Sequence, residues 1–92
     1  MTLQKLRGEI EAVDRELIRL IRARMDIAVR IADEKSSAHL PTRDPGQVDV
    51  VLSRVSALAQ EEGVDPVLVQ DVFRILIRMS EDLQDRKRGQ GK

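Results

Sequence analysis

Two cations interrupt the apolar stripe of the first predicted helix, and both residue types suit the binding of an anion. Arg24 and Lys35 are eleven residues apart, so at about 100° per residue they lie within roughly 20° of each other. Leu17, Ala28 and Ile31 share their line. Buried cations are costly unless paired, and no acid of this helix repeats on that line. Either an anionic ligand supplies the missing charge, or both side chains snorkel at the edge of a helical bundle.

A second pair of polar residues interrupts the third predicted helix. Ser80 and Gln84, four residues apart, continue the line of Val69, Phe73 and Leu76. Buried hydroxyls and amides need hydrogen-bond partners. The pattern therefore predicts either two polar groups directed into a site or two residues beyond the end of the core in a fraying helix.

The first two cations lie on a helix that is unusually long for this chain. From Leu3 to Ala38 apolar residues recur at steps of three and four, with one step of five and no proline. A helix of this length spans roughly 50 Å, whereas a compact chain of 92 residues has a radius of gyration of about 12 Å. The chain alone cannot bury such a helix.

Proline and glycine signals divide the remainder of the chain. Asp44 followed by Pro45 is typical of an N-cap with proline in the first turn, and apolar periodicity then continues to Glu62, just before Gly63. Glycine is expected directly after the end of a helix. A second helix is therefore predicted over residues 45–62.

The same cap signal recurs before the third helix. Asp65 precedes Pro66, and the apolar periodicity that follows is lost from Asp85 onward. We predict an all-α fold with one domain over residues 1–87, formed by three helices, and a disordered basic tail over residues 88–92.

Composition excludes several classes of function. Sixteen basic and sixteen acidic residues cancel, so no global field favours nucleic acid. The absence of cysteine excludes thiolate chemistry, and the single histidine, His39, cannot form a metal site by itself. No leader segment or membrane-length apolar run is visible. We expect a cytoplasmic protein without metal, nucleic-acid partner or membrane association.

Together these residues resemble the small all-helical chorismate mutases. The resemblance covers nearly the whole chain without a gap and includes polar residues that interrupt the apolar stripes. It is carried by Leu6-Arg7, Asp14, Leu17, Arg24, Lys35, the loop His39-Leu40-Pro41-Thr42-Arg43-Asp44, Val64-Asp65-Pro66, Phe73, Ser80 and Gln84. The resemblance implies an intertwined helical-bundle homodimer, in which two long first helices run side by side and each active site draws on both chains.

The resemblance also implies roles for individual residues. Arg24, assisted by Ser80, and Arg7 of the other chain hold the two carboxylates of chorismate. Lys35 contacts a carboxylate and the ether oxygen, Gln84 donates to the ether oxygen, and these two are the catalytic residues. A contribution from the other chain agrees with helical geometry, because Arg7 precedes Arg24 by seventeen residues and points about 100° away from it.

The implied reaction explains why no nucleophile is needed. Conversion of chorismate to prephenate is an intramolecular Claisen rearrangement, which requires no obligatory acid or base and no cofactor. The protein must hold the enolpyruvyl group over the ring. It must also stabilise the negative charge that grows on the ether oxygen as the C–O bond breaks. Such an enzyme would act in shikimate-derived metabolism, including aromatic amino acid biosynthesis.

One segment departs from the family pattern. Asp44 lies where the family places a residue beside the ring hydroxyl, but Gln47 and Val48 replace an Arg-Glu pair. Val48 cannot accept a hydrogen bond from the C4 hydroxyl of chorismate. The segment from Pro45 to Val48 resembles the aminodeoxychorismate mutases more than a chorismate mutase of primary metabolism. That branch and the isochorismate-pyruvate lyases both tolerate an apolar residue in place of the glutamate, but both keep an arginine where Gln47 stands.

Three interpretations follow. The protein is an isomerase of chorismate or of 4-amino-4-deoxychorismate, it is an isochorismate-pyruvate lyase of the same fold, or it is a non-catalytic helical interaction module. The retention of several polar site residues argues against the last: Arg7, Arg24, Lys35, Ser80 and Gln84.

Overall fold

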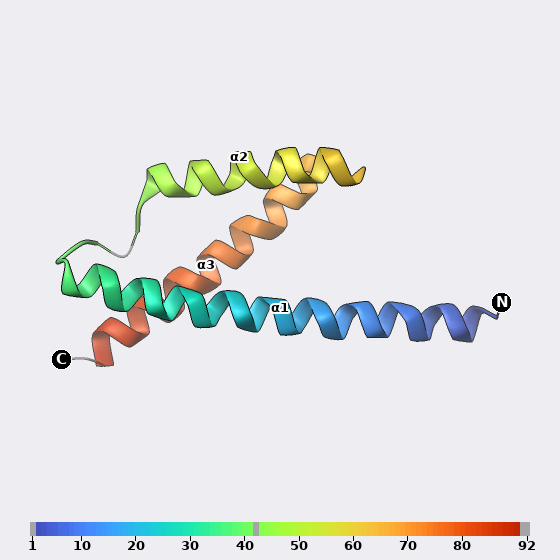
Figure 1. The fold of residues 1–92 in the computed structure, drawn as a ribbon, viewed down its shortest axis with the longest axis horizontal. Coiled ribbons are helices and arrows are strands. Elements are labelled where there is room, and N and C mark those ends of the chain that lie inside the picture. The colour runs from blue at the N-terminus through green and yellow to red at the C-terminus, as the bar shows by residue number, and fades with distance from the viewer. Residues whose placement is uncertain (1, 42, 91–92) are drawn as a thin grey trace.

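Three α-helices form the described part of the chain (Figure 1). The structure is a computed structural model that describes residues 2–41 and 43–90, the last three by their backbone alone. The helices are α1 (Leu3–Ser37), α2 (Pro45–Glu62) and α3 (Pro66–Gln90), and no strand occurs among these residues. The prediction of an all-α fold is confirmed. None of the three helices, within these ranges, combines the length and apolar character needed to span a bilayer.

Local hydrogen bonds define both ends of α1. The Thr2 hydroxyl accepts a bond from the Lys5 amide at 3.2 Å, which satisfies one of the free N–H groups of the first turn. At the other end the Ala38 amide donates to the Glu34 carbonyl at 3.1 Å. His39 then adopts a left-handed conformation with φ of 58°, so the chain turns away before the proline.

Each of the two Asp-Pro pairs lies at the start of the helix that it predicts. The Asp44 carboxylate accepts a bond from the Gln47 amide at 3.2 Å, and the Asp65 carboxylate accepts one from the Val67 amide at 2.9 Å. Gly63 ends α2 in the left-handed region with φ of 71°, which glycine adopts without steric cost.

α3 continues beyond the loss of apolar periodicity at Asp85 and reaches Gln90. The backbone of residues 88–90 therefore belongs to the helix, whereas residues 91 and 92 of the expected tail lie outside the described residues, as does Thr42 of the loop after α1. The domain boundary after residue 87 stays a prediction.

α3 crosses between the other two helices and packs against both (Figure 1). In the described part of the chain α1 and α2 do not pack against each other. The core is accordingly small and consists of side chains on the facing surfaces: Met25, Ala28, Ala32, Val51, Val55, Ala59 and Leu76. The crossing of α3 thus holds α1 and α2 apart and leaves room for a site between them.

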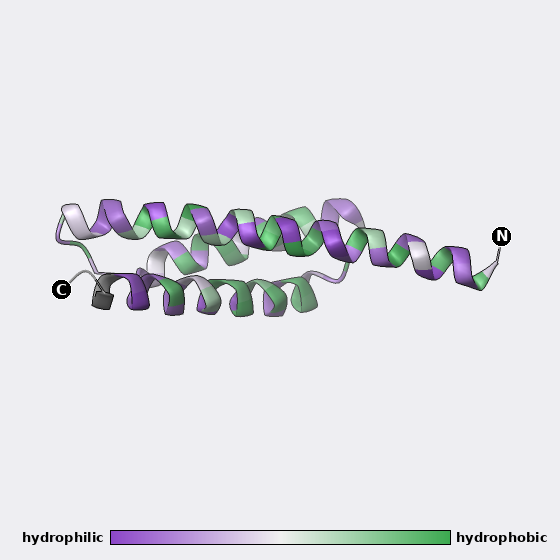
Figure 2. Ribbon diagram, turned by 90° about the horizontal axis from the view of Figure 1, so that it is seen from below, coloured by the Kyte–Doolittle hydropathy of each residue, from purple (hydrophilic) through white to green (hydrophobic). Residues whose placement is uncertain are grey.

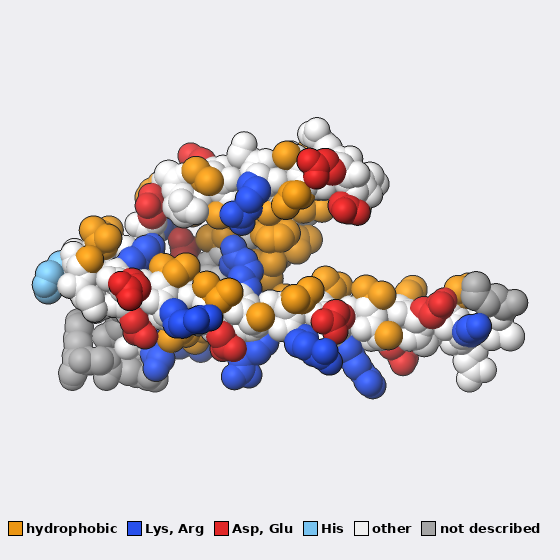
Figure 3. All heavy atoms as spheres, viewed as in Figure 1, with side chains coloured by type: hydrophobic (Ala, Val, Ile, Leu, Met, Phe, Trp, Pro, Cys, Tyr) orange, Lys and Arg blue, Asp and Glu red, His pale blue; other side chains and the backbone are white. Residues whose placement is uncertain are grey.

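The N-terminal half of α1 extends beyond this core. Apolar residues recur along it where no other helix lies alongside (Figure 2), and Figure 3 shows them along one edge of the helix. Leu3 and Ile10, for example, are 63% and 62% exposed. The molecule is 55 Å long with a radius of gyration of 16.4 Å, well above the value for a compact chain of this size. The prediction that the chain cannot bury this helix is confirmed.

Candidate active site

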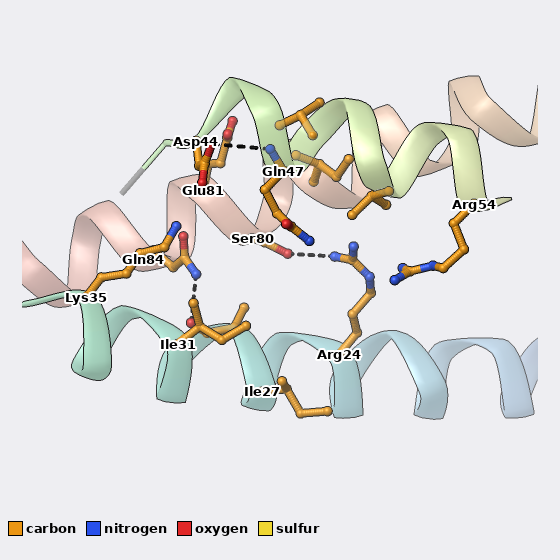
Figure 4. A pocket seen from close by; sticks show the side chains of 14 residues that line it. Arg24, Ile27, Ile31, Lys35, Asp44, Gln47, Arg54, Ser80, Glu81 and Gln84 are labelled. Atoms are coloured by element: carbon orange, nitrogen blue, oxygen red, sulfur yellow. Dashed lines mark hydrogen bonds between the residues drawn. The ribbon is translucent and has the colours of Figure 1, made fainter. Parts of the chain in front are cut away.

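A cavity of about 560 Å³ lies between α1 and α2, with α3 as its floor (Figure 4). This volume suits a small organic molecule. Seven of the eight site residues predicted from the sequence line it: Arg24, Lys35, Asp44, Gln47, Val48, Ser80 and Gln84. The residues come from all three helices and from the loop before α2, so only the folded chain brings them together.

Arg24 is directed into the cavity rather than out of the bundle. One of its terminal nitrogens donates a hydrogen bond to the Ser80 hydroxyl at 3.0 Å, and its guanidinium carbon lies 5.9 Å from the centre of the Phe73 ring. Partial burial lowers the pKa of Arg24, and the positive charge of Arg54 lowers it further. Because arginine titrates far above neutral pH, the group stays charged. The snorkelling alternative is wrong for this residue.

Ser80 and Gln84 are buried, with exposed fractions of 8% and 6%. The Ser80 hydroxyl donates to the Leu76 carbonyl at 3.0 Å while it accepts from Arg24. The Gln84 amide nitrogen donates to the Ala28 carbonyl at 2.8 Å. That bond fixes the amide and uses one of its two N–H groups. The alternative of a fraying helix end is therefore wrong at these positions.

Lys35 lines the same cavity, on the same helix as Arg24. In Figure 4 it lies beside Gln84, at the end of the cavity away from Arg54. The prediction that both cations lie on one face of α1 is confirmed, because both line this cavity. Ala28 lies between them in the sequence and also lines the cavity, which keeps this wall largely apolar between the charges.

The start of α2 forms the opposite wall. Asp44 caps the helix with its carboxylate, and in the view of Figure 4 the Gln47 side chain extends into the cavity toward Ser80 and Arg24. Val48 is half-buried and lines the cavity without a polar atom in its side chain. The departure from the family pattern is therefore located at the cavity wall.

Arg54 is a site residue that the sequence reasoning missed. It lines the cavity from α2, seven residues after Gln47 and three after Val51, and this spacing on one helical face could have identified it. Figure 4 shows its guanidinium directed toward that of Arg24. Among the described residues neither guanidinium has a carboxylate partner. Two like charges at one end of a cavity favour an anionic ligand.

Glu81 is the second residue that the sequence reasoning missed. Its side chain is 24% exposed and lines the cavity, and one carboxylate oxygen lies 4.0 Å from Nε of Arg43. Ile77, Glu81 and Gln84 line the cavity at spacings of four and three along α3. The same periodicity that predicted Gln84 would have included Glu81.

Arg7 is the one predicted site residue that does not line the cavity. It is exposed in the N-terminal half of α1, and seventeen residues of helix place it about 25 Å along the axis from Arg24. One chain therefore does not bring these two arginines together. The contribution of Arg7 by a second copy stays a prediction.

The sequence is similar to those of known proteins. The family model described as "Chorismate mutase type II" matches residues 6–85, which is most of the chain. The chain belongs to the type II chorismate mutase family. A 4-amino-4-deoxychorismate mutase of Streptomyces venezuelae is 36% identical over 75 residues, which cover 82% of this chain and 73% of that protein.

Two further relatives extend the similarity. A chorismate mutase of Methanocaldococcus jannaschii is 29% identical over 82 residues, covering 89% of this chain and 83% of the relative. The T-protein of Haemophilus influenzae is 32% identical over 78 residues, covering 85% of this chain and 21% of the relative. These similarities confirm the resemblance drawn from the residues and the class of enzyme that it implies, a chorismate mutase-type isomerase.

Proposed function

We propose that this protein catalyses the Claisen rearrangement of chorismate to prephenate, or of 4-amino-4-deoxychorismate to 4-amino-4-deoxyprephenate. The observation that supports this best is the convergence of Arg24, Lys35 and Gln84 on one cavity of about 560 Å³. Cations and a fixed amide are the groups needed for a dicarboxylate whose ether bond breaks. No residue of this proposal acts as a nucleophile, because the rearrangement is intramolecular.

The arginine end of the cavity binds carboxylate in this proposal. A guanidinium binds a carboxylate with two parallel hydrogen bonds. Ser80 holds one nitrogen of Arg24 at 3.0 Å, so the side chain is oriented before the substrate arrives. Preorganisation of this kind lowers the entropic cost of holding the substrate in its reactive conformation.

The other end of the cavity carries the catalytic donors. Lys35 supplies an ammonium group, and Gln84 supplies the N–H that its bond to the Ala28 carbonyl leaves available. Both donate to the ether oxygen as negative charge develops on it. Donors fixed in advance stabilise that charge without reorganisation during the reaction. Lys35 and Gln84 are therefore the catalytic residues of the proposed mechanism.

The proposal includes a homodimer. The chain exposes 7380 Å², whereas a compact monomer of 10.4 kDa exposes about 5400 Å². If a second copy covered this excess of about 2000 Å² on each chain, the two chains together would bury about 4000 Å², which lies in the range of obligate homodimer interfaces. Part of the exposed apolar surface lies along the N-terminal half of α1, where a second α1 would cover it, and more lies on α2 and α3. Arg7 of that second copy then completes the carboxylate site. A cytoplasmic location stays part of the same expectation.

Product analysis tests the proposed reaction. The purified protein is incubated separately with chorismate, 4-amino-4-deoxychorismate and isochorismate, and the products are identified by mass spectrometry. We expect an isomer of unchanged mass from at least one of the first two. Release of pyruvate from isochorismate alone would support the lyase instead, and no reaction with any of the three would support a non-catalytic module.

A further inference from the structure

The cavity has a different polarity at its two ends. Arg24 and Arg54 lie toward one end, as Figure 4 shows. Toward the other end, Lys35 extends from α1 and Gln84 from α3, and Asp44 and Glu81 appear above them in the same view and also line the cavity. A ligand that fits both ends has a carboxylate at one of them and a hydrogen-bond donor or a positive charge at the other.

Glu81 is the acid at this end that can turn to a ligand at the lower cost. The Asp44 carboxylate caps α2 by accepting a hydrogen bond from the Gln47 amide at 3.2 Å, and turning it toward a ligand would weaken that cap. The contact of Glu81 with Arg43 is long, at 4.0 Å, and the Arg43 side chain is 73% exposed. An ion pair of this kind contributes little and competes weakly with a ligand. Val48, on the opposite wall, offers no acceptor.

The substrate skeleton relates the two ends of the cavity to particular atoms. In chorismate and its 4-amino analogue the ring carboxylate is on C1 and the variable substituent is on C4, directly across the ring. The ether oxygen is on C3, next to C4. If the ring carboxylate lies against the arginines, the C4 substituent and the ether oxygen reach the other end together. Lys35 and Gln84 then face the ether, and Glu81 faces the C4 substituent.

We propose that Glu81 is a specificity-determining residue that accepts a hydrogen bond from the C4 substituent and favours a C4 ammonium group over a hydroxyl. This inference rests on the function proposed above and selects 4-amino-4-deoxychorismate as the preferred substrate. A carboxylate in an anion-binding cavity repels a ligand whose charges are all negative. An ammonium group on the ligand instead makes a charge-assisted hydrogen bond with that carboxylate. A hydroxyl gains only the weaker, single-charge interaction.

Exchange of the carboxylate for an amide isolates its charge. Glu81→Gln keeps the side-chain length and an acceptor oxygen for a hydroxyl, so we expect kcat/KM for chorismate to change by less than about threefold. For 4-amino-4-deoxychorismate we expect kcat/KM to fall about 10- to 100-fold, because the charge-assisted bond is lost. Asp82→Asn is the matched control, because Asp82 follows Glu81 directly, is exposed and does not line the cavity.

Other outcomes overturn the inference. A wild-type preference for chorismate, an equal loss for both substrates in Glu81→Gln, or the same shift in Asp82→Asn would each contradict a role in selection, while the proposed reaction itself would stand. Turnover of neither substrate by the wild-type protein would instead refute the proposed function and, with it, this inference. Circular dichroism of Glu81→Gln confirms that the variant is folded before the ratios are compared.

Discussion

The two halves of α1 belong to one continuous helix but have opposite surroundings. In the C-terminal half, Met25, Ala28 and Ala32 are buried against α3, and the same half lines the cavity. In the N-terminal half, apolar residues at the same spacing, such as Ile10 and Leu17, are more than half exposed. Periodicity alone does not distinguish the halves, because both carry an apolar stripe.

The two halves of α1 differ in how far contacts within one chain cover their apolar faces. The C-terminal half packs part of its apolar face within the chain, while Ile27 and Ile31 beside the cavity stay 49% and 46% exposed. The residues that line the cavity come from a single copy. The N-terminal half has an apolar face of the same kind with nothing on it among the described residues. Such a face is stable in water when another surface covers it. The comparison therefore predicts different consequences for substitutions in the two halves.

The largest expected effect is in the C-terminal half of α1. Lys35→Ala removes a proposed donor to the ether oxygen, so kcat should fall about 100- to 1000-fold, while the thermal unfolding midpoint stays close to that of the wild type. Arg30→Ala is the control, since Arg30 is an exposed cation of the same half that does not line the active-site cavity. Retention of most activity in Lys35→Ala would refute its assignment as a catalytic residue.

A charge on the apolar face of the N-terminal half of α1 should weaken the dimer. Ile10→Glu places a carboxylate on the apolar face, and burial of an unpaired charge is costly, so the dimer should weaken by about two orders of magnitude or more. Sedimentation velocity across a concentration series measures the change. Arg15→Glu, on the polar side of the same half, should leave the dimer intact. A wild-type protein that sediments as a folded monomer would contradict the proposed dimer directly.

A heterodimer tests whether the two halves act across chains. Arg7→Ala and Arg24→Ala should each inactivate the homodimer. A heterodimer of the two variants, isolated with two different affinity tags, has one site with both arginines intact and should show about half of the wild-type activity. A heterodimer as inactive as its parents would mean that Arg7 and Arg24 do not share a site across the interface.

The smallest expected effect is at Arg54. Arg54 is exposed, so its attraction for a carboxylate is screened by solvent and salt. Arg54→Gln should raise KM by about three- to tenfold at low ionic strength, leave kcat nearly unchanged, and lose this difference as salt is added. Arg78→Gln is the control, because Arg78 is an exposed cation of α3 outside the cavity. An unchanged KM would mean that Arg54 does not contribute and that Arg24 binds the carboxylate at this end alone.

The sequence by itself determined the three helices and the direction of their polar residues. Asp44, Asp65 and Gly63 form the predicted local hydrogen bonds and turns, because caps depend on neighbours within a few residues. The shared direction of Arg24 and Lys35 follows in the same way, because a helix fixes the angle between its own residues.

Only the tertiary structure decided which helical faces meet. The crossing of α3 places Ser80 at 3.0 Å from Arg24 and Gln84 at 2.8 Å from the Ala28 carbonyl, across 56 residues of sequence in both cases. It also brought Arg54 and Glu81 to the cavity. Their spacing places each on a helical face, but spacing alone does not show that this face lines a site. Local spacing determines where a side chain points on its helix, whereas packing between helices determines what it points at.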